Sequence, residues 1–241
     1  MDFVFTLVSS ILSGIAIAIG GAAYLAFYSE SVVIASMLFS IGFLAVVVFE
    51  LNLFTDRIGF LFTQGNIDRN INKMAIGFIG NVLGAFIMGI ILMPEFKDSA
   101  LPLFQAMAKE NTFSCFLGSI ICGMLIFIGI HGYRRANSGF TGCAILLFSA
   151  TTIAVCNFDY AITNLFFISA SFDSVTMYSK RIVDVLAAVL MPAIGNALGV
   201  MIFALLYRFK NLENEENRKH KHHSHRHHHK SERKSSEESN A

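Results

Sequence analysis

The sequence predicts an all-α membrane protein, and its composition and hydropathy pattern are the first evidence for this class. Of the 241 residues, 54% are apolar and only 15% are charged, with a mean hydropathy of +0.59. A soluble globular protein carries about 25% charged residues. Apolar runs of about 18 residues or more, long enough to cross a hydrocarbon core of about 30 Å as a helix, recur as far as Tyr207.

The same composition excludes several other classes. The formal net charge is +1, and half of the 18 Lys and Arg residues follow Tyr207, so no basic surface for nucleic acid is expected. The first apolar run lacks a preceding basic segment and is too long for a cleavable signal peptide. Four cysteines lie inside apolar runs and form neither a disulfide framework nor a Cys-x-x-Cys pair: Cys115, Cys122, Cys143 and Cys156.

Six apolar blocks predict six transmembrane helices. The first, third, fourth and sixth blocks each fit one crossing; they are residues 3–28, 74–93, 112–133 and 181–207. The second block, 32–64, and the fifth, 138–170, are each roughly ten residues longer than one crossing requires. The two long blocks therefore do not fit a single continuous helix.

Polar residues in the middle of both long blocks predict that the second and fifth helices are broken at the midplane. The interruptions are Glu50, Asn52, Thr55, Asp56 and Arg57 in one block, and Asn157, Asp159, Tyr160, Thr163 and Asn164 in the other. Lipid cannot hydrogen-bond an unwound backbone, so such breaks occur inside the protein or beside a water-filled cavity. The alternative for the second block is a helix that ends near Leu51, followed by an ordinary loop over 52–73.

A repeated motif predicts that the six helices form an inverted 3+3 repeat. Ile79-Gly80-Asn81-Val82-Leu83-Gly84 in the third block reappears as Ile194-Gly195-Asn196-Ala197-Leu198-Gly199 in the sixth, 115 residues later. An odd number of crossings separates the two copies, so the two halves would have opposite orientations. The two interrupted blocks then occupy equivalent places, each second in its half.

The repeated motif also has a local meaning. Its glycines, Gly80 with Gly84 and Gly195 with Gly199, stand four residues apart and present a smooth stripe for close helix packing. Asn81 and Asn196 can bind exposed main-chain groups of the interrupted segments, with direct contact to a substrate as the alternative.

The charged residues at the end of the chain predict its orientation. Basic residues are balanced between the two sets of loops, but several, beginning with Arg208 and Lys210, follow the last span, so both termini are expected in the cytoplasm. Residues 1–208 are expected to form the transmembrane domain and 209–241 a disordered tail rich in His, Lys and Arg. That tail would lie near anionic lipid, or bind a metal through its clustered histidines.

Several motifs resemble the formate/nitrite transporters, a family that conducts small monovalent anions. In that family the first break carries an acidic residue followed by Leu-Phe-Thr, and this chain has Asn52-Leu53-Phe54-Thr55 there. The second break carries Phe-Glu-His-Ser-Ile-Ala-Asn-Met-Phe, and the corresponding segment here is Phe158-Asp159-Tyr160-Ala161-Ile162-Thr163-Asn164-Leu165-Phe166. The Gly-Asn-x-x-Gly motifs also resemble the family pattern.

The resemblance implies a homopentamer in which each protomer holds its own pore through an aquaporin-like bundle, with two apolar constrictions around a central polar residue. The implied central site comprises Tyr160, Asp159, Thr55 and Asn164. Phe54, Ile58 and Ile153 would line the inner constriction, and Lys109 would be the basic residue of the outer vestibule. No cofactor and no metal ion are expected.

The central position departs from the family pattern, because Tyr160 stands where the family has histidine. Imidazole, with a pKa near 6.5, exchanges a proton readily, whereas a phenol near 10 keeps its proton and offers a hydrogen bond. The family's first-break acid corresponds to Asn52, and its fourth-span asparagine to Gly123. The resemblance predicts a proton-coupled channel or transporter for small weak-acid anions such as formate, nitrite or hydrosulfide.

Alternatives to this function remain at the sequence level. A divalent metal-cation transporter would use the histidine-rich tail with Glu50, Asp56 and Asp159, although His131 is the only histidine before the tail. A neutral-solute channel of the aquaporin type would have Asn-Pro-Ala at the breaks, and none is present. A non-conducting relative is a further alternative. The sequence contains neither an HExxH nor a GxSxG motif, so neither of these motifs indicates an enzyme.

Asp159 has two interpretations in the sequence. It can cap the N-terminus of a half-helix that begins at Ala161, or it can place a carboxylate in the pore. We expect the cap, because an ionised carboxylate facing the pore would repel anions.

Overall fold

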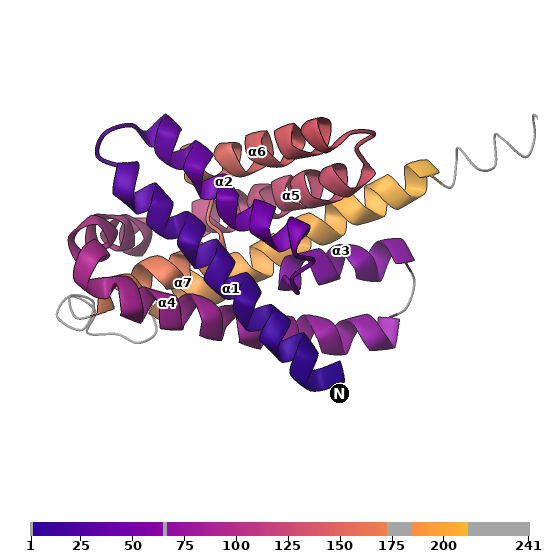
Figure 1. Ribbon diagram of the computed structural model, residues 1–241, viewed down its shortest axis with the longest axis horizontal. Helices are drawn as coiled ribbons and strands as arrows, with labels where there is room; N and C mark the ends of the chain where they lie inside the picture. Colours follow the sequence, from indigo (N-terminus) through magenta and orange to yellow (C-terminus); the bar gives the residue numbers. More distant parts are fainter. Residues whose placement is uncertain (1, 65–66, 173–184, 212–241) are drawn as a thin grey trace, which may run out of the picture.

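The computed structural model describes residues 2–64, 67–172 and 185–211, and all of the regular structure within them is helical (Figure 1). The labelled helices are α1 (Asp2–Phe27), α2 (Val32–Val48), α3 (Phe54–Gln64), α4 (Ile67–Lys109), α5 (Thr112–Arg135), α6 (Gly139–Val155) and α7 (Ala161–Ala170). A last helix, drawn in orange and yellow, covers Val185–Asn211.

Four of the described helices are long and apolar enough to cross a membrane: Phe3–Phe27, Ile71–Lys109, Thr112–Arg135 and Val185–Asn211. α2, α6 and α7 are apolar but shorter. The 17 residues of α2 extend over only about 26 Å, less than the thickness of a bilayer core. Large apolar side chains such as Phe140 and Phe148 are exposed on the outside of the bundle, as a lipid-facing surface requires.

Side-chain caps fix where three helices begin. Ser31 accepts a hydrogen bond from the amide of Ile34 at the start of α2, and Ser138 accepts one from the amide of Thr141 at the start of α6. Asn111 caps α5 in the same way. These side chains satisfy amide groups that lack a partner within the helix.

α2 and α6 end in the same way. Each is followed by a residue with positive φ, Glu50 at 51° and Asn157 at 55°. In both, the next amide donates to the carbonyl five residues back at 2.9 Å, from Leu51 to Val46 and from Phe158 to Ile153. This is the Schellman arrangement, which closes a helix and redirects the chain. Two short non-helical segments, 49–53 and 156–160, therefore separate α2 from α3 and α6 from α7.

The prediction that the third helix ends near residue 93 and is followed by a loop is wrong. α4 continues past residue 93 to Lys109 and contains Pro94 and Pro102. Proline removes one helical hydrogen bond and bends a helix, and the residues that follow Pro94 include good helix formers. Figure 1 shows the last part of α4 turned away from the direction of its first part. The proline therefore bends this helix instead of ending it.

The repeated glycines lie at close crossings between helices. A Cβ atom on Gly84 would lie 2.1 Å from the main-chain oxygen of Ile11 in α1. A Cβ atom on Gly199 would lie 1.9 Å from the main-chain oxygen of Ile120 in α5. Gly80 and Gly195 meet the same two partner helices, at Ser10 and Ser119. Only glycine allows the backbones to approach this closely.

The end of the chain is described only in part. The last helix runs from Val185 to Asn211, whereas the sixth block was expected over 181–207. The predicted tail, apart from its first three residues, lies outside the described residues, as do the first four residues of the sixth block, 181–184.

Candidate functional site: two pockets around a buried tyrosine

Tyr160 lies at the end of the second non-helical segment, where α7 begins, and its side chain is almost completely buried. Its ring packs against that of Phe43, with 5.4 Å between the centroids. Within the described part of the chain, its hydroxyl group has no hydrogen-bond partner. The fold therefore places a phenol group in the interior and leaves its polar end unsatisfied.

Thr55 meets Tyr160 from the opposite half of the chain. It lies in the first turn of α3, is fully buried, and has a hydroxyl group that likewise lacks a partner among the described residues. Its side chain faces the Tyr160 phenol, but the two hydroxyls do not form a hydrogen bond with each other. A buried polar group without a partner costs about 1–3 kcal/mol. A small polar molecule that binds both hydroxyls would remove that cost.

Two asparagines hold the interrupted segments in place. Asn81 donates to the main-chain oxygens of Ser10 and Asn52 at 2.8 and 3.0 Å, and accepts from the amide of Phe54 at 2.9 Å. Asn196 makes the equivalent bonds: it donates to the main-chain oxygens of Ser119 and Asp159, both at 2.9 Å, and accepts from the amide of Ala161 at 3.1 Å. Each asparagine thus satisfies main-chain groups of an interrupted segment and of a neighbouring helix.

The capping role expected for Asp159 is wrong. Tyr160 occupies the N-cap position of α7, and its own side chain makes no capping hydrogen bond. The amide of Ala161 is already satisfied by Asn196. The Asp159 carboxylate instead accepts a hydrogen bond from the side-chain amide of Asn164 at 2.7 Å. Asp159 and Asn164, both assigned to the central site, are thus in direct contact.

A first pocket lies on the Asp159 side of the tyrosine. Its apolar part is mainly aromatic, and its polar part comes from the second non-helical segment and α7. The lining residues are Tyr24, Phe39, Met107, Ile153, Ala154, Asn157, Phe158, Asp159, Tyr160, Thr163, Asn164 and Phe167. The ring of Tyr24 contacts that of Phe39, the ring of Phe39 contacts that of Phe43, and the ring of Phe43 contacts that of Tyr160. Aromatic side chains thus line the approach from this pocket to Tyr160.

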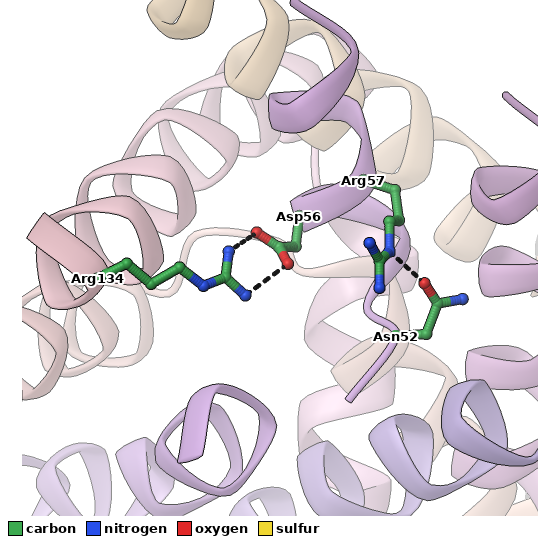
Figure 2. A network of polar contacts seen from close by, with 4 residues as sticks. All are labelled: Asn52, Asp56, Arg57 and Arg134. Atoms are coloured by element: carbon green, nitrogen blue, oxygen red, sulfur yellow. Dashed lines mark hydrogen bonds and ion pairs between the residues drawn. The ribbon is translucent and has the colours of Figure 1, made fainter. Parts of the chain in front are cut away.

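A second pocket lies on the Thr55 side. It is lined by Thr55, Asp56, Gly59, Ile126, Phe127, Ile130, His131 and Val200. Beside it, Arg134 binds both carboxylate oxygens of Asp56, at 2.6 and 2.8 Å. Figure 2 shows this ion pair and the neighbouring contact of Arg57 with Asn52. Charged groups therefore stand at the edge of this pocket but are paired with polar partners.

The two pockets lie toward opposite ends of α5. Side chains beside the first pocket contact Cys115, near the start of that helix, whereas the second pocket includes His131, near its end. Sixteen helical residues separate these positions, which corresponds to about 24 Å. Tyr160 lines one pocket and Thr55 the other, so the two hydroxyls lie between them.

The residues assigned to one constriction lie on different sides of the centre. Phe54 and Ile58 belong to α3, whose Thr55 and Asp56 line the second pocket, and both are buried. Phe54 packs edge-on against Phe78. Ile153 is also buried but lines the first pocket, beside Tyr160.

An acidic cluster lies next to the first pocket. Lys109, the expected vestibule residue, is exposed at the end of α4, and Glu110 follows it. One donor atom from each of Glu110, Cys115 and Asp159 lies within 4.8 Å of the other two, and among the described residues this group alone could hold a metal ion. Partial burial and the nearby Asp159 carboxylate raise the pKa of Glu110 to about 7.

A family model described as formate/nitrite transporter matches residues 1–214. The chain belongs to this family. It is therefore an integral, multi-pass membrane protein of a transport family, as the apolar helices also indicate. No curated protein sequence matches it.

Solved structures of the formate/nitrite transporter family have the same fold. A structure titled "FNT family ion channel" is similar with a TM-score of 0.76 at 15% identity, covering 86% of this chain and 90% of that one. A "Pentameric formate channel with formate bound" is similar with a TM-score of 0.71 at 14% identity, covering 88% and 98%. At this identity, the similarity establishes the fold alone.

Sequence reasoning missed several residues around the pockets of this transporter-family chain. Phe39, which lines the first pocket, and Phe43, which packs on Tyr160, lie in a mostly apolar stretch, where nothing in the sequence distinguishes them from core residues. Glu110 lies in a connection, and only the fold brings it to Asp159. Arg134 directly follows the fourth apolar block, and the carboxylate of Asp56 inside another apolar block was the signal that a basic partner was needed.

Proposed function

We propose that this protein is a proton-coupled channel or transporter for small monovalent weak-acid anions, of which formate is the representative. The observation that carries the proposal is the pair of unpartnered hydroxyls, Tyr160 and Thr55, between two pockets at opposite ends of a helical bundle. Membership of the formate/nitrite transporter family and the likeness to a pentameric formate channel support the substrate class.

We infer that α2–α3 and α6–α7 are the halves of two interrupted spans, and that the bundle is an inverted 3+3 repeat. The matched helix ends at Glu50 and Asn157 support this assignment. So do the matched hydrogen bonds of Asn81 and Asn196, which join the first and third spans of each half to the break between them. Equivalent pairs fall at nearly constant separations along the chain, as an internal duplication requires.

A second pair of contacts supports the same symmetry. Asn52 donates from its side chain to the main-chain oxygen of Lys73 at 3.2 Å, and Asn164 donates to that of Ala188 at 3.1 Å. Lys73 and Ala188 stand 115 residues apart, as do the two copies of the glycine–asparagine motif. The two acceptors thus lie at equivalent places on equivalent helices, although one donor, Asn52, lies in the first break and the other, Asn164, lies in α7 just after the second.

The energetic barrier at the centre explains why a proton accompanies the anion. An isolated anion in an apolar constriction faces a desolvation cost of tens of kcal/mol. Protonating a carboxylic acid with a pKa of about 4 costs only roughly 4 kcal/mol at neutral pH. The neutral acid therefore crosses past Phe54 and Ile153, and the hydroxyls of Tyr160 and Thr55 bind its carboxyl group on the way.

The assembly and orientation follow the same proposal. We propose a homopentamer with one pore in each protomer, supported by the likeness to a pentameric channel. Both termini lie in the cytoplasm, supported by the basic residues that follow the last helix. Residues 209–241 then form a cytoplasmic tail outside the transport domain.

Uptake into proteoliposomes tests this function. Formate, nitrite, hydrosulfide, glycerol and zinc are compared at two pH values, with protein-free liposomes as the blank. We expect the weak-acid anions to enter faster at the lower pH, and glycerol and zinc to remain outside. Tyr160→Phe and Thr55→Val each remove one hydroxyl, and each should slow formate uptake roughly fivefold, from about 1 kcal/mol per hydrogen bond.

Each alternative function gives a different result. Uptake of zinc alone indicates a cation transporter, and uptake of glycerol alone indicates a neutral-solute channel. If no solute enters with the natural protein but Tyr160→His conducts formate, the chain is a non-conducting relative. Each of these results contradicts the proposal.

A further inference from the structure

His131 is a titratable group in the membrane body that the proposed pathway does not yet use. It lies in the last turns of α5, with its ring stacked on Phe127 at 4.7 Å between centroids and 17° between planes. The ring of Tyr207, from the last helix, packs edge-on against it at 5.5 Å. These two contacts hold the imidazole in one orientation.

The Nε2 atom of His131 is buried and has no hydrogen-bond partner among the described residues. The same is true of the Thr55 hydroxyl, and both residues line the second pocket. Two residues from different helices, each with an unsatisfied polar atom, thus line one pocket. Since each unpaired group costs about 1–3 kcal/mol, a small polar occupant of the pocket that bonds to either atom is favoured.

The charged and titratable groups around His131 come from three elements. Asp56 faces it from α3, Arg134 and Arg135 lie on α5 itself, and Tyr207 comes from the last helix. Asp56 is bound by Arg134 through two hydrogen bonds. Arg135 lies over the Tyr207 ring and donates to its hydroxyl. None of these groups occupies Nε2, which remains available to an occupant of the pocket.

We propose that His131 exchanges a proton with the transported weak acid in the second pocket. This inference rests on the proposed function and identifies where the coupled proton is released and taken up. When the neutral acid arrives from the centre, its O–H bond breaks and Nε2 takes the proton, leaving the anion and an imidazolium. The imidazolium then passes that proton to water. In the opposite direction, imidazolium protonates an entering anion.

The chemistry of the pocket suits both directions of this exchange. Imidazole is the side chain best suited to exchanging a proton near physiological pH. A tyrosine at the centre offers a hydrogen bond but no such exchange. Arg135 adds positive charge near the ring, whereas the charge of Arg134 is balanced by the Asp56 carboxylate, which lines the same pocket. The proton-exchanging group is thus displaced from the centre of the bundle to its Arg134 side.

A nuclear magnetic resonance titration tests the site without measuring transport. Seven of the eight histidines lie in the tail, so replacing those seven by glutamine in the full chain leaves His131 as its only imidazole. The labelled ring is titrated in detergent with and without sodium formate, with sodium chloride as the control. We expect a single titration between about pH 5 and 8. Formate should raise its midpoint by about one pH unit, which corresponds to a tenfold preference of formate for the protonated ring.

A transport measurement tests the role of the exchange. His131→Gln keeps a hydrogen-bonding side chain of similar reach but cannot exchange a proton, and the variant with seven tail glutamines is the matched control for the same substitution. We expect His131→Gln to slow formate uptake about 100-fold, the usual contribution of a positioned acid–base group, and to flatten its pH profile. The elution of the protein in gel filtration should not change.

The possible outcomes separate the two proposals. A titration that formate leaves unmoved, or a His131→Gln variant with the natural rate and pH profile, overturns the assignment to His131. A natural protein that transports no weak acid overturns the proposed function. In that case a formate-dependent shift of the His131 titration still supports the site.

Discussion

At the scale of single residues, Tyr160 and Thr55 place two buried hydroxyls between the pockets. The sequence analysis singled out both residues, because each is polar and lies within an apolar block. It could not predict that Glu110 meets Asp159, or that Arg134 pairs with Asp56, because these partners are 49 and 78 residues apart. Asp159 was misjudged for a similar reason, since Asn196 from a distant helix already satisfies the amide of Ala161.

Glu110 makes stability depend on pH. Its pKa is raised to about 7 in the folded protein from an ordinary 4.5, chiefly by burial and then by the charge of Asp159. Between these values the folded state binds more protons than the unfolded state, so stability falls as pH rises through this window. We expect the Tm of the natural protein to fall between about pH 5 and 8, and that of Glu110→Gln to fall less. Parallel Tm profiles for the two proteins would refute this account.

The Asp56–Arg134 pair has a measurable energy. The Asp56 side chain is 7% exposed and that of Arg134 27%, so removing one partner leaves a largely buried charge. We expect Arg134→Gln to lower the free energy of unfolding by about 3 kcal/mol. The double variant with Asp56→Asn should be less destabilised than the sum of the single variants, because neither charge is then left alone. Strict additivity in detergent unfolding would show that the pair is not coupled.

At the scale of elements, the two non-helical segments are built alike. Both follow a Schellman helix end, and both are held by an asparagine from a later helix. The sequence predicted where the polar residues interrupt the apolar blocks, because polar side chains in a membrane span are costly and therefore conspicuous. It did not predict that α4 continues through Pro94, because a proline marks a bend and a helix end equally well.

Close helix crossings predict the effect of adding one methyl group. At Gly199 a Cβ atom would lie 1.9 Å from the main-chain oxygen of Ile120, so the helices must separate. Gly199→Ala should lower the free energy of unfolding by about 3 kcal/mol or more. Gly139→Ala is the matched control, since nothing lies within 4 Å of the added atom. Equal stabilities for the two variants in detergent would argue against the close crossing.

At the scale of the whole molecule, the bundle brings two pockets to the same buried pair of hydroxyls from opposite ends of α5. Hydropathy predicted a membrane protein, because apolar runs of this length are rare in water-soluble chains. The pockets could not be predicted in the same way, because their aromatic lining at Tyr24, Phe39 and Phe167 is indistinguishable from core in the sequence. The central claim about the whole molecule is that weak acids cross it in their neutral form.

Counting protons during formate uptake tests that claim most directly. Proteoliposomes receive formate in a weakly buffered medium, with and without an inside-positive membrane potential, and protein-free liposomes are the reference for leakage through lipid. We predict that about one proton leaves the medium with each formate ion, so that the medium becomes more alkaline and the potential has no effect on the rate. Formate uptake driven by the potential, without a change in external pH, would mean that the anion itself crosses and would contradict the account.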